Sequence, residues 1–234
     1  MLTGLTLLFA KALGELGGRG ILLGVALAWL GPTATDSQPR VSATDTAYLS
    51  CTVWTGKGWS RPTARSARTP VLDSPNGVRA YGEVKIVVKD GSCENTTTLY
   101  VASAEGQEFK VAYKAPSGDG NGIRLIGWSP DGKKLLADVN FWKYETDRGF
   151  GQVPLIYDAA TRQATEIPEA GKALATHFGS DCEFEPSTWS WNGNSQILIR
   201  VSRTPTDESY EQHFCVERPR LFVFDLLKGT VRPK

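Results

Sequence analysis

Hydrophobic and polar residues alternate over short stretches of the chain beyond residue 70. Alternation with a period of two residues predicts β-strands that bury one face, and turn residues separate the stretches. The clearest predicted strands cover residues 78–89, 135–141 and 197–201. We therefore expect an all-β fold.

A similar turn sequence precedes each of these strands and indicates an internal repeat. The turns are SPNG at residues 74–77, WSPDG at 128–132 and WSWNG at 189–193. Pro presets φ and Gly accepts positive φ, so each sequence predicts a tight turn between two strands. A second predicted hairpin follows in every copy, which gives four strands per repeat. The predicted repeats cover about residues 71–115, 122–170 and 184–234.

Four antiparallel strands per repeat is the architecture of a propeller blade. The sequence WSPDGKKLL at 128–136, followed by LIYD at 155–158, resembles the WD40-like Pro-Asp repeat of TolB-like β-propellers. The resemblance covers about residues 71–234, with Trp191 in place of Pro in the third copy and Asp73 in place of Trp in the first. It implies three four-stranded antiparallel blades. Propellers close with four to eight blades, so the resemblance implies either an incomplete propeller or one completed by a second copy.

An apolar stretch at the N-terminus predicts export. Arg19 precedes the apolar run 21–30, and small residues follow up to Ala34, a pattern typical of a signal peptide. The run has roughly half of the 20 apolar residues that a membrane span needs. Residues 1–34 therefore form either a signal peptide or an uncleaved, helical N-terminal anchor. The expected location is periplasmic or extracellular, or membrane-anchored through residues 20–31.

Residues 35–70 are rich in Ser, Thr, Pro and Arg and predict a linker or a cover for an open sheet edge. Within this segment, residues 60–70 contain three Arg and predict an exposed basic loop. The whole chain has 26 basic and 25 acidic residues, so its charge gives no basis for nucleic-acid binding. Contact with a membrane is expected only through the N-terminal segment.

The four cysteines all follow the apolar N-terminal stretch, and an even number is typical of disulfides in an oxidising compartment. The repeat suggests how they pair. Cys93 and Cys215 occupy matching places in the first and third repeats, and Cys51 and Cys182 each lie upstream of the corresponding first hairpin. The predicted disulfides are Cys51–Cys93 and Cys182–Cys215.

Motifs that carry catalysis are not evident. The two histidines, His177 and His213, lack the spacing of a zinc site, and no Gly-x-Ser-x-Gly sequence is present. We therefore expect no catalytic residue, no metal site and no cofactor, and a protein that is not an enzyme. Trp128, Trp189 and Trp191 are expected to pack between blades.

The candidate binding residues lie in long connections within the second and third repeats. Connections at matching places project from the same rim of a repeat protein, and exposed aromatics with nearby charges are typical of interfaces. The candidates are Trp142, Tyr144, Asp147, Arg148, Tyr210, Glu211 and His213.

The predicted function is that of an exported, non-catalytic protein-binding or scaffold module. Its partner would be another protein or a second copy that forms a homodimer and completes a propeller. Two alternatives stay open: a carbohydrate-binding surface around Trp142 and Tyr144, and a hydrolase with a rim site that uses His213.

Overall fold

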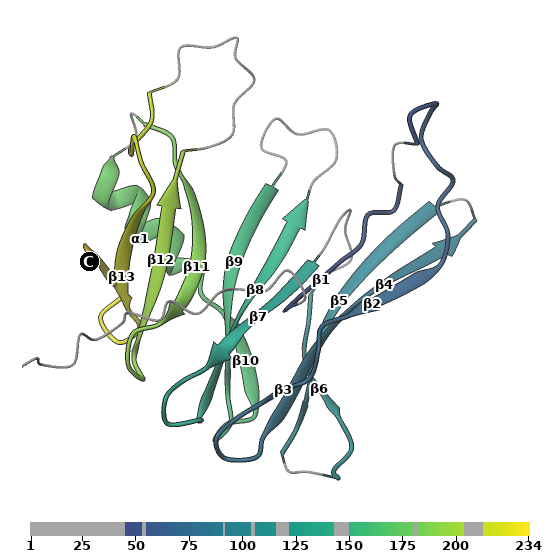
Figure 1. Cartoon of the computed structure of the whole chain (residues 1–234), viewed down its shortest axis with the longest axis horizontal. Helices are drawn as coiled ribbons and strands as arrows, with labels where there is room; N and C mark the ends of the chain where they lie inside the picture. Colours follow the sequence, from purple (N-terminus) through teal and green to yellow (C-terminus); the bar gives the residue numbers. More distant parts are fainter. Residues whose placement is uncertain are drawn as a thin grey trace, which may run out of the picture. The chain divides into compact units, whose positions relative to one another are not determined.

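The computed structural model describes most of the chain beyond residue 44. The apolar N-terminal segment, expected as a signal peptide or anchor, lies outside the described residues. The described ranges are 45–52, 55–90, 92–103, 106–115, 122–142, 150–179, 182–203 and 213–234. They form three antiparallel sheets and one helix (Figure 1).

The first sheet has the strand order β2-β4-β5-β6, and the short β3 also pairs with β4. Ser74 organises the turn between β3 and β4, because its hydroxyl accepts hydrogen bonds from the backbone N–H groups of Asn76 and Val78. Gly77 closes this turn with φ of 78°. The strands are β2 (Arg65–Arg68), β3 (Leu72–Asp73), β4 (Arg79–Lys89), β5 (Ser92–Ala102) and β6 (Lys110–Lys114).

The second sheet repeats this arrangement in the order β1-β7-β8-β9-β10. Ser129 has the role of Ser74, because its hydroxyl accepts the N–H of Lys134 across the turn. Gly132 again has positive φ, at 68°. The strands are β1 (Thr46–Tyr48), β7 (Gly122–Trp128), β8 (Lys134–Trp142), β9 (Phe150–Asp158) and β10 (Gln163–Glu166).

The third sheet follows with the order β11-β12-β13-β14. Between the second and third sheets the chain forms the only helix of the described residues, α1 (Glu169–Phe178), which packs on the third sheet. Phe222 of that sheet contacts the rings of His177 and Phe178. The strands are β11 (Glu185–Trp191), β12 (Gln196–Ser202), β13 (Arg220–Asp225) and β14 (Thr230–Pro233). Thus each predicted repeat forms two hairpins in one sheet.

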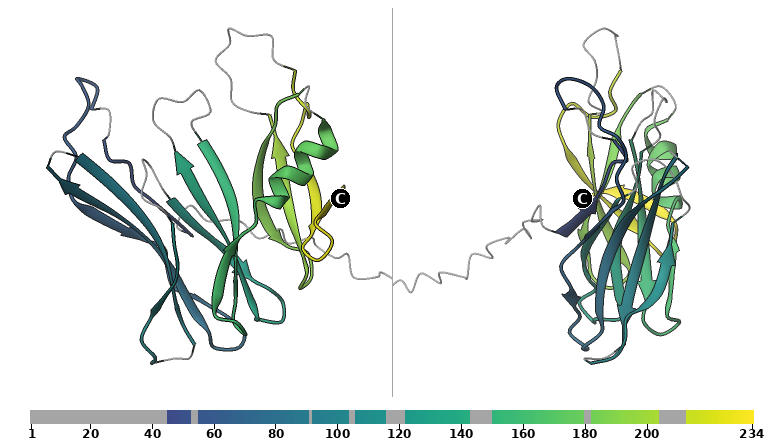
Figure 2. Two further views of the ribbon diagram at one scale, coloured as in Figure 1. Left: turned by 180° about the vertical axis from the view of Figure 1, so that it is seen from behind. Right: turned by 90° about the vertical axis from the view of Figure 1, so that its right-hand side faces the viewer.

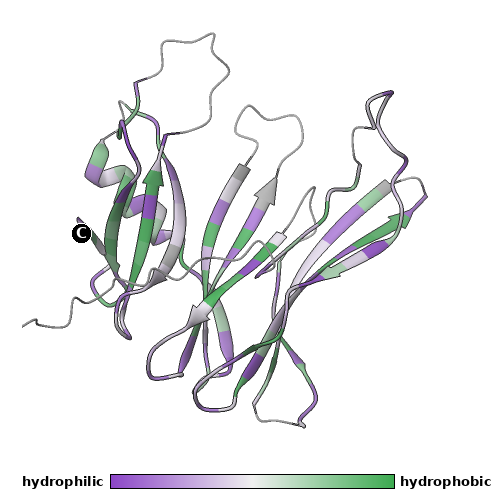
Figure 3. Cartoon of the chain, in the orientation of Figure 1, coloured by the Kyte–Doolittle hydropathy of each residue, from purple (hydrophilic) through white to green (hydrophobic). Residues whose placement is uncertain are grey.

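The strand pattern buries one face of the first sheet against the second. Successive residues of a strand point to opposite faces, and Figure 3 shows the resulting alternation of hydropathy along the strands. Val84 and Leu99 of the first sheet share a buried cluster with Ile123 and Leu135 of the second. Gly82 lies at the closest approach, where an added Cβ would overlap the side chain of Ile123. The two sheets therefore pack through complementary large and small residues.

A second cluster joins the second and third sheets. It combines Leu136 and Ile156 with Ile197 and Phe222, and Leu174 of α1 belongs to the same cluster. The two clusters lie on opposite faces of the second sheet, because Leu135 and Leu136 are adjacent in β8. The second sheet is therefore covered on both sides, and the sheets follow one another in chain order (Figures 1 and 2).

Indole hydrogen bonds connect each repeat to the sheet before it. Trp128 Nε1 donates to the carbonyl oxygen of Leu72 at 3.2 Å, and Trp191 Nε1 donates to that of Gly127 at 2.9 Å. Each tryptophan is the last residue of its strand, and each acceptor is the last but one of β3 or β7. Trp191 is thus the counterpart of Trp128, and its alignment with Pro130 was wrong. The sequence-based alignment matched the turn glycines, but the turn after β11 is shorter: Gly193 follows Trp191 by two residues, whereas Gly132 follows Trp128 by four.

Both predicted disulfides are present. Cys51 pairs with Cys93 at a Cα–Cα distance of 6.0 Å, and Cys182 pairs with Cys215 at 4.9 Å. Two disulfides are typical of proteins that fold in an oxidising, exported environment.

Part of the segment expected as a linker or cover belongs to the sheets. Residues 65–68, expected in an exposed basic loop, form β2 and pair with β4. The loop prediction was wrong because the pairing uses backbone groups, and Ala67 packs against the core between two exposed arginines. Residues 46–48 form β1, which pairs with the edge of β7.

Candidate functional site

The binding rim predicted from the sequence lies mostly outside the described residues. Tyr144, Asp147, Arg148, Tyr210 and Glu211 all fall there, and Trp142 ends β8 with only its backbone described. His213 lines an open cavity beside the Cys182–Cys215 disulfide. The other lining residues are Arg203, Phe214, Glu217 and Arg218. The rim stays a prediction.

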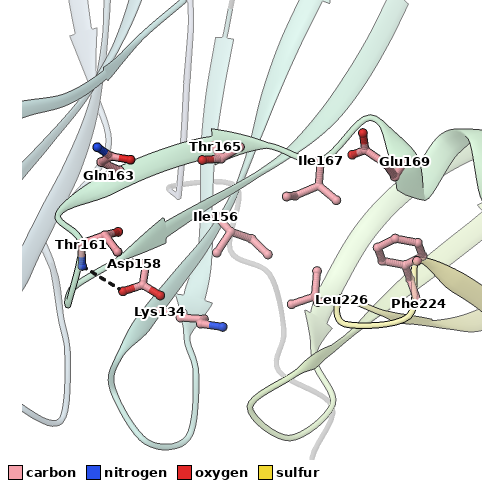
Figure 4. Close-up of a pocket in the computed structure, with 11 residues that line it drawn as sticks. Lys134, Ile156, Asp158, Thr161, Gln163, Thr165, Ile167, Glu169, Phe224 and Leu226 are labelled. Atoms are coloured by element: carbon pink, nitrogen blue, oxygen red, sulfur yellow. Dashed lines mark hydrogen bonds between the residues drawn. The ribbon is translucent and has the colours of Figure 1, made fainter.

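An open groove of about 370 Å³ lies between the outer strands of the second and third sheets (Figure 4). Ile156 and Phe224 line it from the two sheets, and Glu169 at the start of α1 lines it as well. The carboxylate of Asp158 accepts the backbone N–H groups of Ala160 and Thr161 at 2.8 and 3.3 Å and so organises the β9–β10 turn. Asp158, one of the two acidic residues that line the groove, therefore already has a structural role.

A buried ion pair within the second sheet, between Arg124 of β7 and Asp138 of β8, also contacts the third sheet. Arg124 Nη2 donates to Asp138 Oδ2 at 2.5 Å and to the carbonyl oxygen of Thr188 at 2.7 Å. Burial raises the pKa of Asp138, and the charge of Arg124 opposes that shift. A buried carboxylate with a raised pKa can indicate a catalytic acid. Here the carboxylate is fully buried beside its guanidinium, so the pair serves to hold the sheets together.

The face of the first sheet that points away from the second sheet is different in character, and we call it the outer face. None of its residues belongs to the hydrophobic cluster between the first two sheets. Its two valines, Val87 and Val111, are 50% and 59% exposed. The strand alternation and the ring contacts assign to it the charged residues Arg68, Asp73, Arg79, Glu83, Lys85, Lys89, Glu94 and Lys114 and the aromatic and apolar residues Tyr81, Val87, Tyr100, Phe109 and Val111.

Glu83 organises the charge of the outer face. It is 1% exposed and lies beneath two cations. Arg68 Nε donates to its Oε1 at 2.6 Å, and Lys85 Nζ lies 2.8 Å from its Oε2. Burial alone would raise the pKa of Glu83, but the hydrogen bonds from Lys85 and Arg68 outweigh it and hold that pKa below its usual value. One carboxylate thus fixes two exposed cations and leaves a net positive charge.

Aromatic rings support the same surface. Tyr81 stacks on Tyr100 with ring centroids 4.9 Å apart, and Phe109 meets Tyr81 edge to face at the same distance. The Arg68 guanidinium lies 5.2 Å from the Tyr81 ring centroid, and that of Arg79 lies 5.7 Å from Phe109. Cations held over aromatic rings are restricted in their motion, so the outer face presents its positive charge in a fixed arrangement.

The described part of the chain gives no sign of other site chemistry. Within it, no three His, Cys, Asp or Glu side chains are grouped so that they could hold a metal ion. It also contains no helix with the length and apolar character needed to cross a membrane.

Comparison with protein-family models gives no match to this chain, and no curated protein matches it significantly. The fold and the site therefore identify a structural class and no particular family. The protein is an antiparallel β-protein of three sheets, each built from a sequence repeat, with two disulfides.

Proposed function

We propose that this protein is an exported, non-catalytic protein-binding module of the TolB-like propeller type, and that its binding surface is the outer face of the first sheet. The observation that carries the proposal is that the outer face exposes the fixed cations Arg68 and Lys85 together with two valines, Val87 near Lys85 on β4 and Val111 two strands away on β6. Interfaces combine exposed apolar side chains with polar groups in this way.

The position of the outer face supports this function. Trp128 and Trp191 each donate a hydrogen bond to the preceding sheet, whereas Asp73 has the matching place at the end of β3. Asp73 instead pairs with Arg79 at 3.0 Å within its own hairpin. The first repeat therefore lacks the group that would bind a blade in front of it, and its outer face is free for a different kind of contact.

Export is the second part of the proposal. Two disulfides and the N-terminal signal-like sequence favour a periplasmic or extracellular location. Cells that express the full chain can be fractionated, and the thiols in each fraction blocked before electrophoresis. Oxidised protein in the exported fraction is the expected result, and reduced protein confined to the cytosol would contradict it.

Site-specific crosslinking tests the binding function. A photoreactive phenylalanine derivative replaces Val111 in the full chain, and irradiation is carried out in cells of the source organism. The control carries it at Leu227, which is 83% exposed in the turn between β13 and β14 of the third sheet. A discrete protein adduct from position 111 alone supports the proposal. Equal labelling at both positions, or no adduct at position 111, contradicts it.

A further inference from the structure

We propose that the partner of the outer face is an acid-rich segment of another protein, whose carboxylates pair with Arg68 and Lys85 while its apolar side chains pack on Val87 and Val111. This inference rests on the proposed function and names the chemistry of the partner.

The charge of the outer face points to an acidic partner. Strand pairing places five cations on this face against three carboxylates. The cations are Arg68, Arg79, Lys85, Lys89 and Lys114, and the carboxylates are Asp73, Glu83 and Glu94. On the outer face, the Arg68 and Lys85 side chains are 60% and 49% exposed above the single buried Glu83.

The geometry of the two cations suits carboxylates. Arg68 contacts Glu83 through Nε, so its two terminal nitrogens stay available for a second carboxylate, which guanidinium binds in a two-pronged fashion. Lys85 uses one of its three ammonium hydrogens on Glu83. Because Glu83 and Tyr81 already hold these side chains, a partner loses less conformational entropy when it pairs with them.

A second copy of this chain fits the outer face less well. Two outer faces in contact would bring Arg68 and Lys85 of one copy against those of the other, and like charges at an interface are unfavourable. Contact with the third sheet of another copy would need apolar residues on that sheet's far side. Leu198 and Val223 have that position, but they are only 6% and 2% exposed within a single chain.

A carbohydrate also fits less well. Sugars bind aromatic side chains by lying flat on a ring face. The rings of Tyr81 and Tyr100 lie against each other with an interplanar angle of 14°, and Arg68 lies over Tyr81, so these ring faces are already engaged. Anionic polysaccharide is therefore an outcome of the test and not the proposal.

The test uses the full chain and two synthetic peptides in calorimetric titrations. One peptide alternates Glu and Val, and the other has Lys in place of every Glu. We expect the acidic peptide to bind, its affinity to fall as salt is added, and the basic peptide not to bind. Equal binding of both peptides, or equally tight binding of heparin, would overturn the inference.

Paired substitutions at Val111 separate charge from apolar contact. Val111→Glu and Val111→Lys remove the same exposed side chain from the edge strand β6, so both variants should fold like the natural chain. Val111→Glu should weaken acidic-peptide binding roughly threefold to fivefold, and Val111→Lys should keep or strengthen it. Equal weakening by both substitutions would overturn the acidic partner.

Arg68→Gln should weaken binding by a similar factor, because Lys85 still neutralises Glu83 in that variant. Lys172→Gln on α1, a matched removal of an exposed cation, should have no effect on binding. The failures of the two proposals are distinguishable. A protein adduct at position 111 without binding of the acidic peptide would support the proposed binding function and would contradict the acidic partner.

Discussion

The indole Nε1 of Trp191 donates a 2.9 Å hydrogen bond to the carbonyl oxygen of Gly127, sixty-four positions earlier in the chain. This bond joins the third sheet to the second, as the bond from Trp128 to Leu72 joins the second to the first. The same contact thus recurs at both sheet junctions.

Trp191→Phe and Trp128→Phe should each lower the free energy of unfolding by about 1 kcal/mol, because a partly buried carbonyl loses its donor. Urea unfolding followed by circular dichroism measures the change. Leu227→Ala is the control, since Leu227 is 83% exposed, and it should have a smaller effect. Equal losses in all three variants would contradict the role assigned to the indole bonds.

Gly82→Ala should destabilise the protein by about 1–3 kcal/mol, because the new methyl group overlaps Ile123 of the neighbouring sheet. Gly151→Ala in β9 is the control, where the added methyl meets no neighbouring atom. The double variant Gly82→Ala/Ile123→Ala should show a coupling energy, since the second change removes the overlap. Strict additivity of the two losses would argue against close approach of the sheets at Gly82.

Replacing either cysteine pair by serine should cost about 4 kcal/mol of unfolding free energy in the chain-entropy account. The two loops are similar, with sequence separations of 42 and 33, so the two losses should be similar as well. Peptide mapping without reductant checks the pairing, and chemical denaturation checks the loss. Mapped peptides that join Cys51 to Cys182 or to Cys215 would show that the pairing is wrong.

Glu83 should make stability depend on pH. Its pKa is lower in the folded chain than in the unfolded chain, so its contribution is present above the unfolded value of about 4.3 and is lost as pH falls through the folded value. The natural chain should therefore be more stable than Glu83→Gln at neutral pH, and the difference should shrink as pH falls below about 5. Denaturation at several pH values measures it, and a difference that does not vary with pH would contradict the prediction.

The repeat and the strands could be predicted because they depend on local sequence, and the cysteine pairing could be predicted from matching positions in the repeat. Turns such as residues 128–132 need Pro and Gly for their backbone angles, and strand alternation follows from a two-residue period. The shorter turn after β11 could not be predicted, because Asn192 and Gly193 are typical turn residues in either alignment. For this reason Trp191 was aligned with Pro130.

The sequence of β4 contains a pattern that indicates the outer face. Arg79, Tyr81, Glu83, Lys85 and Val87 alternate with the apolar core residues of β4. Their charge shows that this side of the strand is not core. It does not show that Glu83 is buried, because the residue that covers Glu83 is Arg68, which comes from a different strand, β2.

The sequence by itself determined that this protein is built from three β-repeats, where its strands turn, and which cysteines pair, since these follow from backbone preferences and repeat position. Only the tertiary structure decided which sheet faces are buried and which side chains meet across the outer face. Those contacts join Arg68, Glu83 and Lys85 from two strands and Tyr81, Tyr100 and Phe109 from three segments, and strand pairing alone brings them together.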